Sequence, residues 1–139
     1  MSSFRPHAVL TNGQQVGRMS AAFPRFAVRM SRNLVEWRGE ITPFGCSKTY
    51  LISITFSLQR RVKVRVVEPV LQSLPGKKIP HRFRDGSLCL NLPEEWNSSM
   101  PVAEILIPWI SDWIYYYEIW LATGDWIGGG HEPCVGRED

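Results

Sequence analysis

The sequence has few cysteines, little excess charge and no long charge-free apolar run, and each shortage excludes a class of protein. Only three of its 139 residues are cysteines, Cys46, Cys89 and Cys134. An odd number without paired spacing argues against a disulfide framework and predicts thiols in a reducing compartment. The alternative for Cys134 is an exposed thiol that forms a disulfide with a partner or with Cys89. The net charge of +3 comes without the dense basic stripe of a nucleic-acid module. The most apolar stretch, "VAEILIPWISDWIYYYEIWLA", contains three carboxylates and belongs to a core rather than to a membrane.

Leader, cofactor and metal signals are also lacking. The first residues, "MSSFRPHAVLTNGQQ", have no uninterrupted apolar core behind a basic residue, so we expect no signal peptide and a cytoplasmic protein. A zinc site needs four ligands, and His131 with Cys134 is one pair without a second. The chain also has no nucleotide-binding loop. We therefore expect neither a metal nor another cofactor, and no nucleic-acid or membrane partner.

The composition predicts one globular domain over residues 1–139, with residues 1–10 and 131–139 as candidates for flexible ends. Hydrophobic residues make up 44% of the chain, and 12% of the residues are aromatic, which is enough for a single core at this length. Helical and strand-like segments succeed one another as described below. The fold class we expect is α+β.

The first half of the chain predicts one helix and an antiparallel meander. Residues 11–23, "TNGQQVGRMSAAF", favour a short helix that begins at Thr11 or Asn12 and stops before Pro24. Stretches rich in β-branched and aromatic residues follow, joined by short connections that favour antiparallel pairing. These stretches are "RFAVRM", "LVEWRGEI", "TYLISITFSL" and "RVKVRVVEP". Their alternation predicts one buried and one wetter face, with Tyr50, Ile52, Ile54, Phe56, Val62, Val64 and Val66 on the buried side.

The second half predicts a long irregular span and then a helix. Residues 69–100 are punctuated by prolines and glycines without a sustained period, and such a span in a small domain is usually functional. A helix follows from about Pro101, capped by Ser98 or Ser99 and stopped by Gly124. Pro108 should kink or split it. The glycine-rich end after this helix is either a mobile tail or a flap packed by Trp126.

Cys89 lies in the irregular span, within "IPHRFRDGSLCLNLPEEW", and allows two interpretations. Cysteine is among the most buried residue types, so a small core residue is the common explanation. Cations that approach a thiol favour the reactive thiolate, and five such residues precede Cys89: Lys77, Lys78, His81, Arg82 and Arg84. A solvated basic loop would explain the same charges.

The order of parts around Cys89 resembles the active-site segment of ubiquitin-conjugating enzymes. Gly86-Ser87-Leu88-Cys89-Leu90 matches the cysteine end of their pattern, Pro80 matches its proline, and Trp96 lies close to its tryptophan. His81 falls where the eukaryotic pattern has asparagine, and Ile79 replaces the eukaryotic histidine. Together with "W.GEITP" and "ILIPWI..W...YE.W..TGDW", this departure resembles the bacterial conjugating-enzyme-like proteins of CBASS antiphage operons, over about residues 14–130.

The resemblance implies a fold and an activity. The fold would be that of ubiquitin-conjugating enzymes, with an N-terminal helix, a four-stranded antiparallel meander, the cysteine loop and a crossover helix, but without the C-terminal helices of eukaryotic relatives. Cys89 would carry the C-terminus of a cGAS-like nucleotidyltransferase as a thioester and transfer it to an acceptor, which would regulate antiphage signalling. Either a separate activating protein charges the cysteine, or the mechanism departs from the familiar relay.

Site roles and one alternative function remain open at this point. His81 could donate to the oxyanion, act as a base or brace the loop. Asn91 could position a substrate or close an Asx-type turn. Six aromatic residues between Trp109 and Trp120 are too many for one buried stripe. A non-catalytic protein that docks the nucleotidyltransferase on the same fold is therefore the alternative to an enzyme.

Overall fold

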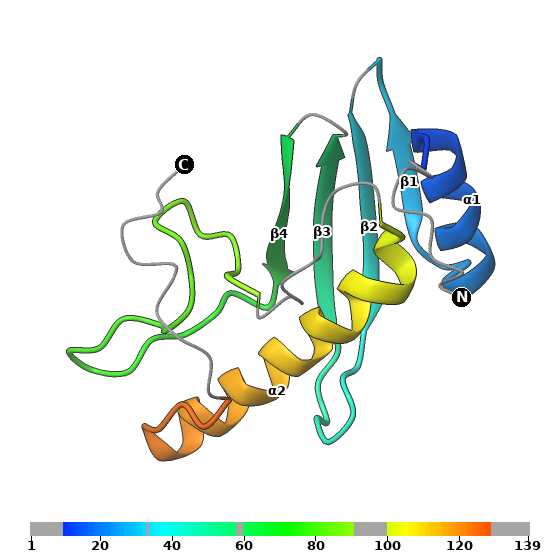
Figure 1. Ribbon diagram of the computed structural model, residues 1–139. Helices are drawn as coiled ribbons and strands as arrows, with labels where there is room; N and C mark the ends of the chain where they lie inside the picture. Colours follow the sequence, from blue (N-terminus) through cyan, green and yellow to red (C-terminus); the bar gives the residue numbers. More distant parts are fainter. Residues whose placement is uncertain (1–9, 33, 58–59, 91–99, 129–139) are drawn as a thin grey trace, which may run out of the picture.

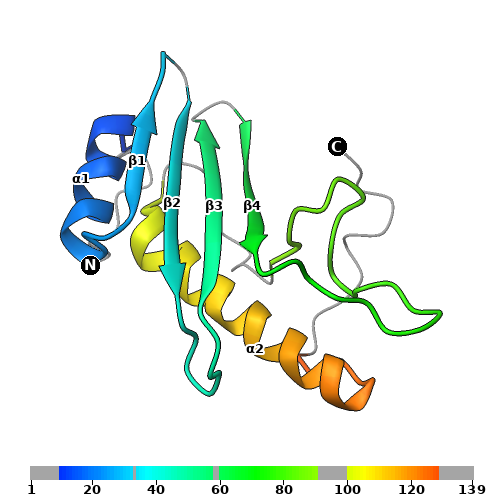
Figure 2. The same cartoon turned by 180° about the vertical axis from the view of Figure 1, so that it is seen from behind.

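The computed structural model describes residues 10–32, 34–57, 60–90 and 100–128. One antiparallel sheet forms its centre, with the strands in sequence order β1, β2, β3, β4. Helix α2 crosses one face of this sheet, α1 lies beside β1, and an irregular loop lies beyond β4 (Figures 1 and 2). The described part of the chain is therefore α+β, as the sequence predicts.

Helix α1 spans Asn12–Ala22 and begins as its sequence predicts. The Thr11 hydroxyl accepts from the Gln14 amide at 3.0 Å, and the Gln14 side chain accepts from the Thr11 amide at 2.9 Å. This reciprocal capping box satisfies two amides that a helix start leaves without partners. The helix ends at Ala22, two residues before Pro24.

The four predicted strands are confirmed as a meander. They are β1 Ala27–Met30, β2 Val35–Ile41, β3 Tyr50–Ser57 and β4 Arg60–Glu68. Every pair is antiparallel, with Val28 opposite Trp37 and Trp37 opposite Ile54. The register between β3 and β4 shifts at two places, where Leu51 gives way to Ile52 and where Thr55 gives way to Ser57.

One face of the sheet forms the core, as the alternation predicts. Tyr50, Ile52, Ile54 and Phe56 are each at most 1% exposed, and Val64 is 2% exposed. Val62 and Val66 are half-buried and pack against the same cluster. Helix α2 supplies the other half of the core with apolar residues at helical spacing, which are Ile107, Ile110, Trp113, Ile114, Tyr117 and Trp120. The apolar face of the sheet, with its period of two, therefore packs against the apolar face of α2, with its period of 3.6.

The second helical region is divided rather than kinked. A π-helical turn, η1, spans Val102–Leu106, and α2 spans Ile107–Thr123 with Pro108 in its first turn. Proline has no amide hydrogen, and the first turn of an α-helix is where that loss costs least. Pro101, where the helix is predicted to begin, is the N-cap of η1. Gly124 ends α2 with φ of 86°, as predicted, whereas Ser98 and Ser99 lie outside the described residues.

A buried glutamine joins α1 to the start of the second helical region. Gln15 is fully buried, its amide nitrogen donates to the Met100 carbonyl at 2.7 Å, and its amide oxygen accepts from the Val102 amide at 2.9 Å. An exposed ion pair between Arg18 and Glu104 lies on the same interface, with 3.2 Å between the charged atoms. Both polar ends of the glutamine are satisfied, so its burial carries no unpaired-group penalty.

Candidate functional site

The loop that carries Cys89 is anchored to the core at both of its flanks. Ile79 is 6% exposed and Leu88 is 5% exposed, and Leu90 packs against the same cluster. The Leu88 amide donates to the Val64 carbonyl at 2.8 Å, which fixes the cysteine segment beside β4. Cys89, between two core leucines, is half-buried. The core role of Ile79 agrees with its apolar side chain at a position where the eukaryotic pattern has histidine.

Cys89 and His81 are neighbours through their backbones. The Cys89 amide donates to the His81 carbonyl at 2.9 Å, and Arg82 pairs with Leu88 in an antiparallel bridge. His81 has φ of 54°, a left-handed conformation that non-glycine residues rarely adopt. Such strain persists where surrounding contacts over-determine it, commonly at functional sites. Two residues that the sequence analysis assigned to the site are therefore brought together.

A side chain of helix α2 binds the backbone of the same histidine. The indole nitrogen of Trp113 donates to the His81 carbonyl at 2.9 Å, so this carbonyl accepts from both Trp113 and Cys89. Further back in the loop, the Gln72 amide donates to the Tyr117 hydroxyl at 2.7 Å. Trp113 and Tyr117 stack on each other with ring centroids 5.8 Å apart. The buried face of α2 thus positions the loop as well as filling the core.

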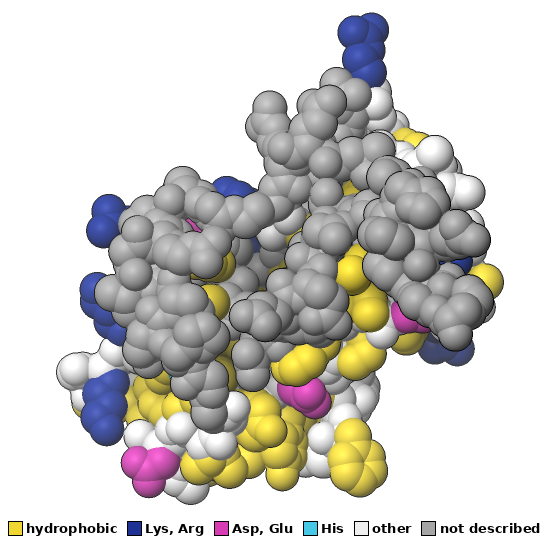
Figure 3. Space-filling model, in the orientation of Figure 1, with side chains coloured by type: hydrophobic (Ala, Val, Ile, Leu, Met, Phe, Trp, Pro, Cys, Tyr) yellow, Lys and Arg dark blue, Asp and Glu magenta, His cyan; other side chains and the backbone are white. Residues whose placement is uncertain are grey.

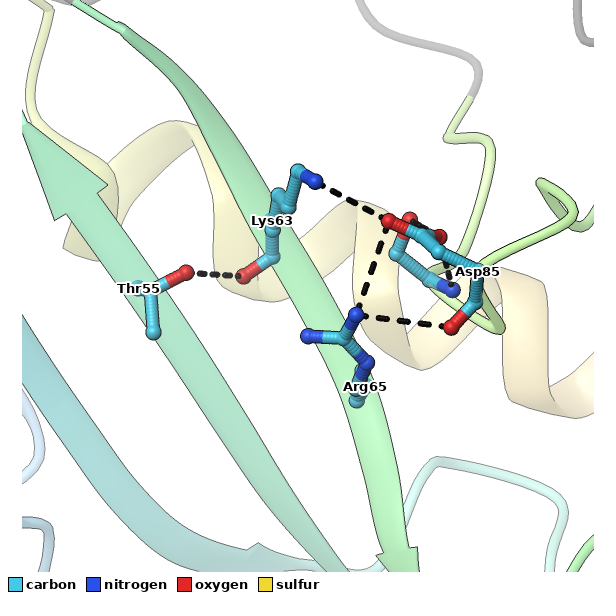
Figure 4. A network of polar contacts seen from close by, with 5 residues as sticks. Thr55, Lys63, Arg65 and Asp85 are labelled. Atoms are coloured by element: carbon cyan, nitrogen blue, oxygen red, sulfur yellow. Dashed lines mark hydrogen bonds and ion pairs between the residues drawn. The ribbon is translucent and has the colours of Figure 1, made fainter. Parts of the chain in front are cut away.

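Asp85 fastens the tight turn before the cysteine to β4 (Figure 4). Its carboxylate accepts from the Ser87 hydroxyl at 2.6 Å and the Ser87 amide at 2.9 Å. It also pairs with Lys63 at 3.0 Å and with Arg65 at 3.5 Å, both from β4. The hydrogen bonds from Ser87, and then Lys63, hold the pKa of Asp85 well below its ordinary value, although partial burial opposes them. The turn is therefore locked by an ionised carboxylate.

The thiols differ from one another. Cys89 is disulfide-bonded in this structure, which differs from the thiol that its sequence context predicts. Cys46, on the connection between β2 and β3, is a free thiol. Burial and the neighbouring Glu118 raise the pKa of Cys46 to about 11, so this thiol is protonated and unreactive at neutral pH. Cys134 lies outside the described residues.

The remaining features singled out in the sequence are Asn91, Trp96 and the basic residues before Cys89. Asn91 and Trp96 lie outside the described residues. The basic residues before the cysteine, Lys77, Lys78, Arg82 and Arg84, are all exposed, and basic side chains line the rim of the molecule on the loop side (Figure 3). Within the described residues, no group of three His, Cys, Asp or Glu side chains could hold a metal ion.

Three residues around the site have roles that the sequence analysis did not assign. Asp85 fills the role that Asp-Gly-Ser signals, a turn in which an aspartate accepts from the backbone two residues on. Trp113 lies at the helical spacing of the core residues, and its hydrogen bond to the loop has no local sequence signal. Trp126 packs on His81, with ring centroids 5.1 Å apart. Of the two alternatives for the glycine-rich end, its described part is the packed flap.

Comparison with protein families places this arrangement in a known group. The family model described as type II CBASS E2 protein matches residues 15–133, which includes the sheet, the cysteine loop and α2. The chain therefore belongs to the family of type II CBASS E2 proteins, and the predicted resemblance is confirmed. A comparison with curated proteins finds no match. Among the described residues, no helix has the length and apolarity needed to cross a bilayer.

Proposed function

We propose that this protein is a ubiquitin-conjugating-like acyltransferase that carries the C-terminus of a cGAS-like nucleotidyltransferase as a thioester on Cys89. It then transfers this C-terminus to an acceptor and so regulates antiphage signalling. The observation that carries the proposal is the fixed backbone pairing of Cys89 with His81 in a chain of the type II CBASS E2 family. Acyl transfer needs a nucleophile within reach of a group that can donate or accept a proton, and this backbone pairing keeps the two residues adjacent.

The proposed reaction has two steps, formation of the thioester and its aminolysis. In the first, the Cys89 thiolate attacks an activated carboxyl at the donor's C-terminus, a C–S bond forms, and the activating group leaves with the electron pair of its bond. In the second, an amine attacks the thioester carbonyl, a C–N bond forms, and the thiolate leaves while the amine loses a proton. Each step passes through an oxyanion that requires a hydrogen-bond donor.

His81 is the residue best placed to assist these steps. Its imidazole can donate to an oxyanion or accept the proton of the incoming amine, and its carbonyl already holds the Cys89 amide. The exposed cations of the loop, including Arg82 and Arg84, favour a thiolate as attacking and leaving group. We assign His81 and Cys89 to the catalytic pair, with Asn91 as a substrate-positioning residue.

The supply of the activated carboxyl is a separate step. Either a separate activating protein delivers it as an adenylate or as a thioester, or the mechanism departs from the familiar relay. The disulfide at Cys89 would first be reduced, because a sulfur bonded to another sulfur cannot attack a carbonyl. Two electrons from a thiol reductant free the Cys89 thiol.

A docking protein on the same fold is the second candidate, and exposed aromatic surface favours it. Tyr115 on α2 is 38% exposed and Ile127 is 61% exposed, and hydrophobic side chains gather over the lower part of the molecule in Figure 3. Trp109, on the same helix, is half-buried. A partner could cover this surface, and Cys89 would then be dispensable.

Intact-mass analysis of the protein co-expressed with a cGAS-like nucleotidyltransferase and an activating protein separates the two functions. After reduction, an adduct of the donor's mass on wild type, cleaved by hydroxylamine and absent in Cys89→Ala, supports the acyltransferase. Cys46→Ala is the matched control and should keep the adduct. An adduct released only by reductant is a disulfide. No adduct, with equal binding of the nucleotidyltransferase by wild type and Cys89→Ala, would contradict the acyltransferase and support docking.

A further inference from the structure

Trp126 lies beyond the end of α2 at the centre of an aromatic cluster that includes the site histidine. Its ring centroid is 5.1 Å from that of His81, 5.4 Å from that of Trp113 and 6.2 Å from that of Tyr116. The planes of Trp126 and His81 are inclined by 37°. One face of the imidazole is therefore covered by an indole that is itself supported by two further rings.

The short segment that carries Trp126 is built to bring it there. Gly124 turns the chain back with φ of 86° at the end of α2. At Gly128, a β-carbon would lie 2.5 Å from the Tyr116 ring and 2.9 Å from the Trp126 indole nitrogen. Only glycine fits such an approach without displacing one of the two rings. The two glycines thus lie on either side of a short segment that packs against α2 through the indole of Trp126.

His81 is consequently held by two tryptophans at two different points. The Trp113 indole nitrogen fixes the His81 carbonyl, and the Trp126 ring lies against the imidazole. A backbone with φ of 54° does not by itself fix the side-chain torsions of the histidine. A ring packed against one face of the imidazole restricts those torsions and shields that face from water.

We propose that Trp126 is a positioning residue that fixes the orientation of the His81 imidazole beside Cys89. The inference rests on the proposed function, because the orientation matters for the rate at which the acyl group is passed on. Trp126 contacts the ring and not the backbone pairing of His81 with Cys89. Its loss therefore slows the chemical step while the cysteine loop and donor binding are retained.

Kinetics test the consequence for the reaction. Misplacing a catalytic group by about 1 Å can cost on the order of a hundredfold in rate, so we expect Trp126→Ala to slow aminolysis of the Cys89 thioester by about tenfold to a hundredfold. The KM for the amine should remain within about twofold, since a positioning role changes the reacting geometry and not ground-state binding. Trp126→Phe keeps an aromatic face and should restore most of the rate. Phe44→Ala removes a ring that is 96% exposed on the connection between β2 and β3, and as the control it should react as wild type.

Spectroscopy tests the contact without any reaction. The chain has three histidines, and His81→Gln identifies the ring-proton resonances of His81 in an NMR spectrum of the reduced protein. An indole face 5.1 Å away shifts these resonances by its ring current. We expect the shift to disappear in Trp126→Ala, to persist in part in Trp126→Phe and to be unchanged in Phe44→Ala.

The two measurements separate this inference from the proposed function. His81 resonances that are the same in wild type and Trp126→Ala would overturn the positioning role, whatever the reaction shows. Equal rates of thioester aminolysis in wild type and Trp126→Ala would also overturn the positioning role. If wild type forms no thioester, the acyltransferase fails, and the NMR spectra alone decide whether Trp126 orients His81. Changed resonances with slowed aminolysis support both.

Discussion

The two edges of the sheet are held in opposite ways. At one edge, β1 is a regular strand, yet all four of its residues are exposed, with Val28 at 40% and Met30 at 53%. At the other edge, the loop beyond β4 has almost no regular structure, yet side chains tie it down at several points. Its anchors are Gln72 to Tyr117, His81 to Trp113, Asp85 to Lys63 and Arg65, and Leu88 to Val64.

This difference shows that regular secondary structure and a firmly fixed backbone are separate properties. A strand ladder satisfies backbone groups but does not bury side chains by itself, and local stability follows burial and contact. An irregular loop can be held as firmly when indole, phenol and carboxylate groups bind its backbone. The proposed acyl transfer would need a sulfur in fixed surroundings, and the anchored loop beyond β4 holds the backbone of Cys89 in place through its amide.

Removing the Trp113 anchor should have the largest effect. Trp113→Ala deletes a ring that is 4% exposed and the hydrogen bond to the His81 carbonyl, so we expect a loss of about 4 kcal/mol in the free energy of unfolding. Trp113→Phe keeps the stacking on Tyr117 and should lose about 1 to 2 kcal/mol. Urea denaturation followed by circular dichroism measures both. A Trp113→Phe variant as stable as wild type would show that the hydrogen bond to the loop contributes nothing.

Asp85 should come next, and its contribution should depend on pH. Asp85→Ala leaves the Ser87 groups and two cations without their acceptor, which we expect to cost about 2 kcal/mol at pH 7. Folding lowers the pKa of Asp85 below that of the unfolded chain, so the stabilisation by its charge is complete above about pH 4 and declines as the pH falls further.

The pH dependence of the Asp85 contribution is best isolated with Asp85→Asn, which keeps the shape of the side chain and removes the charge. The stability difference between wild type and Asp85→Asn should be largest near neutral pH and should shrink below about pH 4. Urea midpoints at a series of pH values measure it. A difference that stays constant from pH 7 to pH 3 would mean that the carboxylate charge does not lock the turn.

The two described cysteines should differ in reactivity once the protein is reduced. With a pKa of about 11, Cys46 is ionised to only about one part in a thousand at pH 8, whereas an ordinary thiol is ionised to about a quarter. We expect N-ethylmaleimide to label Cys89 at least about tenfold faster than Cys46. Peptide mapping after limiting labelling measures the ratio. Faster labelling of Cys46 would mean that the braced loop shields its own sulfur.

Substitutions on the open edge should have the smallest effect. Met30→Ala and Arg29→Ala alter exposed side chains of β1, and surface changes of this kind usually stay within about 0.5 kcal/mol. The Arg29 side chain is 86% exposed and lies 3.9 Å from Glu36 in a weak surface pair. The same urea experiment measures both variants. A loss above about 1 kcal/mol in either would erase the contrast between the two edges.

Much of the fold could be predicted from the sequence because its signals are local. Thr11 and Gln14 form a capping box within four residues, and the alternation from Tyr50 to Phe56 appears unchanged as a buried face. The division of the second helical region at Pro108 followed from the missing proline amide, although a π-helical turn before it has no simple pattern. Local rules work here because each concerns residues that touch their own neighbours.

The site could be predicted only in part, since its bracing contacts join distant residues. Cys89 and His81 were found because a family pattern records their spacing. The bond from Trp113 to His81 spans 32 residues and that between Gln72 and Tyr117 spans 45, and no periodicity encodes such pairings. The left-handed backbone of His81 depends on these contacts and not on its own propensity, so the sequence gives no sign of it.

The buried amide of Gln15 also sets an order of events during synthesis. Its oxygen accepts a hydrogen bond from the Val102 amide, which lies 87 positions further along the chain. At about 5–20 residues per second, the ribosome needs on the order of ten seconds to make that partner. Until then α1 has neither its buried hydrogen bonds nor the surface that covers it, and a lone helix of 11 residues is marginal in water. α1 therefore gains its buried hydrogen bonds only after the sheet and the chain up to Val102 have been synthesised.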